Sequence, residues 1–322
     1  MKNLEKCDLC GNTKFEFLDK VYDHQFAIDQ AYSLCKCKNC GLIFINPQPT
    51  NKELSKHYPK DKYHSSQLTK LRDLDLKTYE IYDSGKKNMI KKILFYPIRM
   101  TKRSSKIIPG GRILDVGCGA GNFLALMKKF KMECYGVDPQ SPNEDFAKKY
   151  DLNISQKDLK ETHYPDNFFD VITMNQVFEH VSNPTETLQE IHRILKKNGT
   201  LIFAVPNTKS FCFKIFGSDW VSLDVPRHLF DYNPEIIKKY AKKTGFKFES
   251  LRFHSSHFQF MGSILYWSNK FRKKKIYLSK SDSSILLTKF AAGFFLIPAL
   301  ILNILKIGDQ FEVRLKKTDS SQ

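Results

Sequence analysis

Apolar runs alternate with amphipathic stretches through the middle of the chain. The runs at 112–116, 170–174 and 200–205 are mostly apolar and typical of buried strands. The stretches at 122–130 and 184–199 have apolar positions at helical spacing, and we expect the second of these helices to begin at Pro184 and end at Gly199. This alternation predicts an α/β fold, with a parallel sheet covered by helices on both faces.

The same pattern continues around these elements. We expect further helices at 142–150 and 233–245, and further strands at 133–138, 152–155, 246–253 and 310–317. Residues 256–307 interrupt the alternation, because 290–302 is a wholly apolar run of thirteen residues. The sequence therefore predicts a sheet domain with one helical insertion.

Changes in composition divide the chain into four parts. Residues 1–60 hold five of the eight cysteines and form a small N-terminal module. Residues 61–108 are expected to form a basic helical linker with a helix broken at Pro97, since the chain has no acidic residue between Asp83 and Asp115. Residues 109–255 and 308–318 make up the sheet domain, and 256–307 a basic and apolar helical insertion.

Four cysteines of the N-terminal module have the spacing of metal ligands. Cys7 and Cys10 form one pair, Cys37 and Cys40 a second, and a glycine follows each pair. Two such pairs offer four thiolates to a tetrahedral zinc ion, and the glycines relieve the tight turns. We expect a structural Zn²⁺ site in a zinc-ribbon-like module, with Cys35 as a spectator thiol.

The chain is strongly basic. Its 52 Lys and Arg against 34 Asp and Glu give a formal net charge of +18. Such a charge attracts nucleic acid, anionic lipid or a phosphorylated substrate, although a solvated Lys-rich surface explains it as well. The first ten residues carry a Glu and two Cys where a signal peptide has an apolar run, so we expect a cytoplasmic protein with reduced cysteines.

A glycine-rich turn follows the first predicted strand of the sheet domain. Gly117, Gly119 and Gly121 have the spacing G-x-G-x-G, which differs from the G-x-G-x-x-G of dinucleotide sites. Asp115 ends the strand before the turn, where a carboxylate suits a cationic amino-acid or sulfonium group rather than a pyrophosphate. Asp138 ends the next strand and is placed to accept both hydroxyls of a ribose.

The turn and its acidic partners resemble those of the class I S-adenosylmethionine-dependent methyltransferases. The stretch FFDVITMNQVFEHVSNPTETLQEIHRILKKNGTLIFAVPN at 168–207 is similar to that family's fourth strand, helix and fifth strand. The resemblance implies a Rossmann-like sheet and S-adenosyl-L-methionine as cofactor. It also implies that Asp158 contacts the adenine, and that Asn175 and Gln176 line the cofactor.

The cysteine pairs narrow the resemblance to a smaller group within this family. Together with CKNCGLIFINPQPT at 37–50 and FGSDWVSLDVPRHLFDY at 216–232, they are similar to bacterial methyltransferases of sugar and polysaccharide biosynthesis. Methyl transfer needs alignment of acceptor and methyl, and a base for one proton. His180 and His228 follow strands beside the cofactor and are the candidate bases. Candidate substrate contacts are Arg227, Glu179 and Trp220.

Within the insertion, a basic stretch of the sequence is followed by an apolar one. Residues 269–280 contain six Lys or Arg and precede the apolar run, which is too short to span a bilayer. One interpretation is peripheral membrane contact through 269–307, and the other is a helix buried on the core or in a dimer interface.

Several functions compete. The favoured one is methyl transfer to a small-molecule or lipid-linked sugar, with a lipid or quinone-like acceptor as alternative. Quinone-precursor methyltransferases hold a divalent metal with Glu-x-x-Glu-His, and Gln176 replaces the first Glu here. A nucleic-acid substrate is disfavoured, because NQVFEH stands where base methyltransferases carry an Asn- or Asp-Pro-Pro-aromatic motif. A non-catalytic membrane scaffold is disfavoured by the intact glycine turn.

Overall fold

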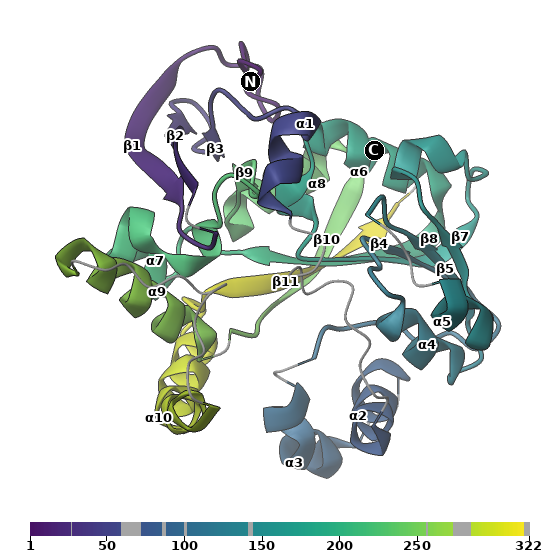
Figure 1. The fold of residues 1–322 in the computed structure, drawn as a ribbon. Helices are drawn as coiled ribbons and strands as arrows, with labels where there is room; N and C mark the ends of the chain where they lie inside the picture. Colours follow the sequence, from purple (N-terminus) through teal and green to yellow (C-terminus); the bar gives the residue numbers. More distant parts are fainter. Residues whose placement is uncertain are drawn as a thin grey trace.

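A seven-stranded sheet runs through the centre of the protein, in the order β10-β11-β8-β7-β4-β5-β6 (Figure 1). Its strands are β4 (Arg112–Val116), β5 (Glu133–Val137), β6 (Asn153–Ser155), β7 (Phe169–Asn175), β8 (Leu195–Pro206), β10 (Phe246–Phe253) and β11 (Gln310–Lys317). The computed structural model describes residues 1–26, 28–58, 72–85, 88–99, 102–140, 144–255, 257–272 and 285–318. The predicted α/β fold is confirmed.

The sheet is mixed rather than wholly parallel. Strands β8, β7, β4, β5 and β6 are parallel neighbours, whereas β11 is antiparallel to both β8 and β10. Phe253 at the end of β10 pairs with Phe311 near the start of β11, so the pair is a hairpin whose long loop is the insertion. The expectation of a parallel sheet was wrong here, because the insertion returns the chain to the end at which it left.

Helices cover both faces of the sheet, as predicted. Neighbouring residues such as Ile113 and Leu114 belong to two separate apolar cores, one on each face. One core takes in α6 (Pro184–Ile194), α8 (Pro234–Lys243) and the N-terminal module, and the other takes in α2 (Asp73–Asp83), α4 (Asn122–Lys128) and α5 (Glu144–Lys149). The helix expected to reach Gly199 ends at Ile194 instead, because Leu195 is extended and pairs with Phe169 of β7.

The N-terminal module is built around a second, antiparallel sheet with the order β1-β2-β3-β9. Its strands are β1 (Phe15–Asp23), β2 (Ile28–Cys37), β3 (Ile43–Ile45) and β9 (Phe230–Asp231), and the short α1 (Asn51–Leu54) follows β3. Because β9 comes from the sheet domain, the N-terminal module shares a sheet with that domain. The two are therefore joined by backbone hydrogen bonds as well as side chains.

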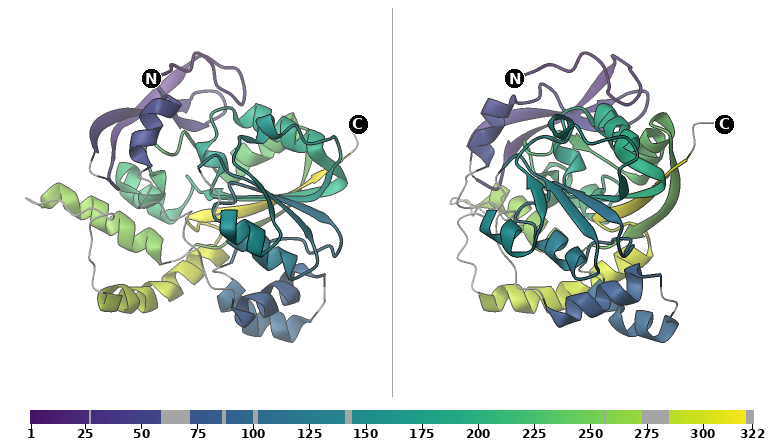
Figure 2. Two further views of the ribbon diagram at one scale, coloured as in Figure 1. Left: turned by 45° about the vertical axis from the view of Figure 1, so that its right-hand side comes forward. Right: turned by 90° about the vertical axis from the view of Figure 1, so that its right-hand side faces the viewer.

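The remaining helices lie at the edges of the molecule. α3 (Met89–Arg99) follows α2, α7 (Phe211–Phe216) follows β8, and the insertion contains α9 (Phe258–Ser268) and α10 (Ile285–Ile304) (Figure 2). α3 continues two residues beyond Pro97, so the predicted break at this proline is wrong. Among the described residues, no helix has the length and apolar character needed to cross a membrane. Most of the basic stretch 269–280 lies outside the described residues.

Candidate functional site

The glycine turn connects β4 to α4 at the carboxyl ends of the parallel strands. Gly117, Gly119 and Gly121 all have positive φ, at +69°, +53° and +86°. A Cβ at Gly117 would lie 2.4 Å from a methyl carbon of Val177, and one at Gly121 would lie 2.8 Å from Ile154. The turn therefore requires glycine, because of its positive φ and because Val177 and Ile154 pack directly against it.

Asp115 lies beneath this turn and is almost wholly buried. Its carboxylate accepts hydrogen bonds from Arg103 Nη2 at 2.7 Å and from Thr173 Oγ1 at 2.6 Å. Burial raises the pKa of Asp115, and the Arg103 guanidinium acts against that rise. Arg103, which also lies over the ring of Phe123, was not found by sequence reasoning, because nothing in its neighbourhood points to a partner twelve residues away.

Asp138 ends β5 with its side chain facing the turn. One oxygen accepts the N–H of Gly119 and the other the N–H of Gln140, each at 2.9 Å. A carboxylate has about four lone-pair sites, so the two bonds leave capacity for the two hydroxyls of a ribose. Asp115, the three glycines and Asp138, which the sequence predicts to bind the cofactor, are thus brought together around one turn.

Three further residues predicted to contact the cofactor follow neighbouring strands. Asp158 caps the short helix Leu159–Thr162 beyond β6. Asn175 ends β7 and is partly exposed, and Gln176 has a φ of +55° and donates from Nε2 to Gln310. All three lie beyond the carboxyl ends of parallel strands, the edge at which such sheets bind ligands.

Glu179, His180 and His228 form a compact cluster beside the turn. Val177 packs over Gly117, and the segment that follows carries Glu179 and His180. The rings of His180 and His228 are 4.7 Å apart, and His228 Nε2 lies 3.8 Å from Glu179 Oε1. One donor atom from each residue lies within 4.8 Å of the others, so the cluster could hold a metal ion. Gln176 is bonded to Gln310 and takes no part.

Burial determines the protonation of this cluster. It lowers the pKa of His228 to about 3, with a smaller contribution from His180, and it lowers the pKa of His180 too. Burial also raises the pKa of Glu179 well above its usual value, and neither carboxylate oxygen has a hydrogen-bond partner among the described residues. At neutral pH both imidazoles are therefore uncharged, each with one unprotonated ring nitrogen.

Two contacts orient the His180 ring. Its Nδ1 lies 2.9 Å from the carbonyl oxygen of Arg227 and 3.1 Å from the hydroxyl of Tyr58. Because a carbonyl only accepts, Nδ1 carries the proton in this contact and the lone pair is on Nε2. This tautomer suits a base acting through Nε2.

Arg227 connects the loop before β9 to the N-terminal module. It is 1% exposed, and its five N–H groups are directed at Asp23, Asp224 and the carbonyl of His57. His57 Nδ1 also lies 2.6 Å from Asp23, which completes a buried network. The predicted contact of Arg227 with a substrate would require one of these bonds to be exchanged.

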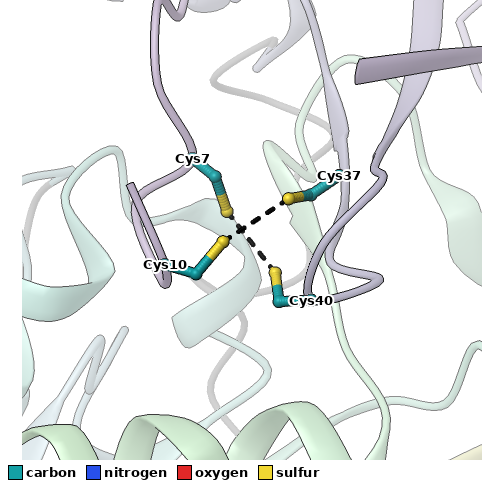
Figure 3. Close-up of side chains that lie close together, drawn as sticks. All are labelled: Cys7, Cys10, Cys37 and Cys40. Atoms are coloured by element: carbon teal, nitrogen blue, oxygen red, sulfur yellow. Dashed lines mark hydrogen bonds between the residues drawn. The ribbon is translucent and has the colours of Figure 1, made fainter. Parts of the chain in front are cut away.

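The four predicted metal ligands converge on one point (Figure 3). The sulfur atoms of Cys7 and Cys40 are 3.6 Å apart, and those of Cys10 and Cys37 are 3.5 Å apart. Zn–S bonds of about 2.3 Å in a tetrahedron place sulfurs roughly 3.8 Å from one another. Disulfides need about 2.05 Å, so the cluster has the dimensions of a metal site. Gly11 and Gly41 after the two pairs have positive φ, as the tight turns require.

The cysteine cluster is fixed to the sheet domain through Asp8. The Asp8 carboxylate accepts hydrogen bonds from Thr185 at the start of α6 and from Tyr240 in α8. Lys243 donates to the Asp8 carbonyl and Lys239 to that of Cys40. The first cysteine pair thus packs on the two helices that cover this face of the sheet.

A small hollow of about 10 Å³, with room for about one water molecule, lies between the N-terminal module and the sheet domain. Tyr22 of β1 and His24 and Gln25 of the β1–β2 turn line one side. The other side consists of Ser218, Trp220, Leu223, Asp224 and Val225, with Tyr266 of α9. Asp224 also lies 3.9 Å from His228 Nε2, which places the hollow next to the histidine cluster. Trp220 contributes little surface, being 1% exposed with its indole N–H donated to Asp309.

Fold and site together define a class I S-adenosylmethionine-dependent methyltransferase. The profile of the family described as "Methyltransferase domain" matches residues 89–251, half of the chain, and the chain belongs to this family. The predicted enzyme class is thereby confirmed.

Individual relatives are more distant. The chain is 26% identical over 167 residues to a ubiquinone biosynthesis O-methyltransferase of Coxiella burnetii, covering 48% of this chain and 71% of the relative. A protein of the same name from Bradyrhizobium diazoefficiens is 32% identical over 149 residues, which cover 43% of this chain and 59% of the relative. A SAM-dependent methyltransferase structure from Archaeoglobus fulgidus has a TM-score of 0.44 at 22% identity, covering 74% and 98% of the two chains.

Proposed function

We propose that the protein transfers a methyl group from S-adenosylmethionine to a sugar, a nucleotide sugar or a lipid-linked glycan precursor. The observation that carries this proposal is the uncharged His180–His228 pair beside the glycine turn. The hollow next to this pair is too small to hold a sugar ring as it stands, but Gln25, Ser218 and Asp224 in its lining offer hydrogen-bonding groups to a polyhydroxylated acceptor.

The donor side of the reaction rests on the glycine turn. The cofactor supplies the methyl group on a positively charged sulfur. The three glycines give the turn its shape, Asp138 can accept the ribose hydroxyls, and Arg103 can pair with the carboxylate of the methionine part. These contacts hold the donor and leave the acceptor to be oriented by other residues.

The acceptor proton goes to the histidine pair. His180 presents Nε2 as a lone pair, and His228 is kept neutral by burial. An acceptor hydroxyl next to either imidazole loses its proton as the oxygen attacks the methyl carbon. Asp224, which lines the hollow and adjoins His228, stabilises the resulting imidazolium.

A zinc ion in the four-cysteine cluster completes the proposal. It stabilises the N-terminal module, which contributes Tyr22, His24 and Gln25 to the hollow. The cluster offers four sulfurs and leaves no protein ligand position open, so its role is structural.

A quinone-like acceptor is the second candidate. The relatives are named as ubiquinone biosynthesis O-methyltransferases, which favours a phenolic hydroxyl. That similarity covers less than half of the chain, and the hollow takes Tyr22 and Tyr266 from outside the family match.

A labelling experiment separates the two candidates. The protein is incubated with methyl-labelled S-adenosylmethionine and, separately, nucleotide sugars, extracted membrane lipid and a catechol. The proposal predicts label in the nucleotide sugars or in a sugar released from the lipid by mild acid, and none with His228→Ala. Label in the catechol alone would replace the proposal by the second candidate.

A further inference from the structure

Two helices present apolar side chains to solvent on one side of the molecule. In α10, Phe294, Ile297 and Ile301 follow each other at helical spacing and are 74%, 65% and 50% exposed. In α3, Ile90, Ile93 and Leu94 are similarly exposed. Both helices lie along the side opposite the N-terminal sheet in every view (Figures 1 and 2).

The inward face of α10 is already used by the protein. Phe295 stacks on Phe260 of α9 at 4.9 Å, Ala299 and Leu302 are buried, and Asn303 exchanges hydrogen bonds with Ser255. The helix is therefore docked by one stripe, and its opposite stripe is the exposed one. α3 is anchored at its C-terminal end, where Arg99 is bound bidentately to Asp83 of α2.

The sequence segments that contain α3 and α10 are basic, whereas α2, which packs against α3, carries Asp73, Asp75, Glu80 and Asp83. Between Glu249 and Asp309 the sequence contains one acidic residue, Asp282, against nine Lys or Arg, and it has no acidic residue between Asp83 and Asp115. Lys91, Arg272 and Lys306 are exposed beside the apolar stripes. Trp267 and Phe271 are exposed at the end of α9, a type of residue enriched at lipid interfaces.

We propose that α3, α9 and α10 form a surface, the docking face, that binds peripherally to an anionic lipid membrane. An amphipathic helix with an apolar stripe and basic flanks lies in the plane of a bilayer interface, its stripe among the acyl chains and its cations at the head groups. A second copy of the chain fits less well, because a symmetric pairing would bring the basic flanks together. The docking face is independent of which acceptor the enzyme methylates.

Vesicle flotation tests the docking face directly. The full chain is mixed with phosphatidylcholine vesicles that either contain or lack phosphatidylglycerol. We expect binding to the anionic vesicles, weakened by salt, and at least about tenfold weaker binding for Phe294→Glu/Ile297→Glu and for Ile93→Glu/Leu94→Glu. The matched control is Phe17→Glu, because Phe17 is 57% exposed on β1, on the other side of the molecule.

Two further readouts keep the test decisive. Affinity for S-adenosylmethionine, measured by calorimetry, should be unchanged in all variants, which shows that they fold and separates this proposal from the one on the acceptor. An absence of binding by the parent chain, or equal binding by the paired variants, overturns the docking face. Light scattering that finds a parent dimer and monomeric variants, with no vesicle binding, assigns the face to a second copy instead.

Discussion

The donor side and the acceptor side of the site are assembled in different ways. Gly117, Gly119 and Gly121 lie within one turn, and Asp115 and Asp138 end the two strands beside it. The hollow beside His228 takes residues from the β1–β2 turn, the 217–225 segment and α9. A site made by adjoining strands survives the loss of distant segments, whereas one made between modules depends on every contact that holds the modules together.

The cysteine cluster and the buried Arg227 network hold the N-terminal module against the rest of the protein. The cluster reaches α6 and α8 through Asp8, and Arg227 joins Asp23 of β1 to Asp224 beside the histidines. β3 pairs with β9, and Leu229 donates to the carbonyl of Glu179. The N-terminal module is therefore joined to the histidine cluster on the proposed acceptor side, while the glycine turn has no contact of this kind with the module among the described hydrogen bonds.

The largest expected effect is on catalysis. His228→Ala and His180→Ala should each lower kcat by about 10²- to 10⁴-fold, because the proton of the acceptor loses its base. Affinity for S-adenosylmethionine, measured by calorimetry, should stay the same, since neither side chain belongs to the glycine turn. Normal turnover in both variants would remove the histidines from the mechanism.

The next effect concerns stability. Arg227→Ala should reduce the free energy of unfolding by about 3–5 kcal/mol, because it leaves the buried Asp23 carboxylate without its cation. Lys148→Ala, which removes an exposed ion pair with Glu144, is the control and should cost less than about 1 kcal/mol. Urea titration measures both, and equal effects would mean that the network does not hold the modules together.

Donor binding should respond to Asp138. Asp138→Ala removes a charged acceptor for two ribose hydroxyls and should weaken S-adenosylmethionine binding by about 10- to 100-fold. Asp158→Ala, at the exposed cap beyond β6, provides the comparison and should have the smaller effect. Calorimetry that finds unchanged affinity for Asp138→Ala would exclude this residue from the cofactor site.

A smaller effect depends on pH. Burial alone would raise the pKa of Asp224, but Arg227 lowers it to about 2. A lowered folded-state pKa gives stability that is present above the unfolded value near 4 and lost as the pH falls toward 2. The parent should therefore lose about 2 kcal/mol over this range, and Asp224→Asn should lose less. Identical pH profiles in urea titrations would show that Asp224 is not held by Arg227.

The sequence predicted the glycine turn, on the donor side, better than the residues around the histidine cluster, on the proposed acceptor side. The strands, the glycine turn and the four-cysteine spacing are local patterns, and the structure places them as expected. The Arg103–Asp115 pair and the antiparallel β11 escaped prediction, because each depends on how distant segments meet. So did Arg227, which was expected to face substrate and instead lies in the interface with Asp23. The end of α6 was misplaced because strand pairing outweighs the helical pattern of 195–199.

One variant measures how far methyl transfer depends on the N-terminal module. Cys37→Ser removes a ligand from the four-cysteine cluster, with Cys35→Ser, a buried thiol outside the cluster, as control. Zinc content, S-adenosylmethionine affinity and methyl transfer are measured on the same preparation. The account predicts lost zinc and turnover reduced at least about 100-fold, with donor affinity within about twofold of the parent. Full turnover without zinc, or loss of donor binding together with turnover, would contradict it.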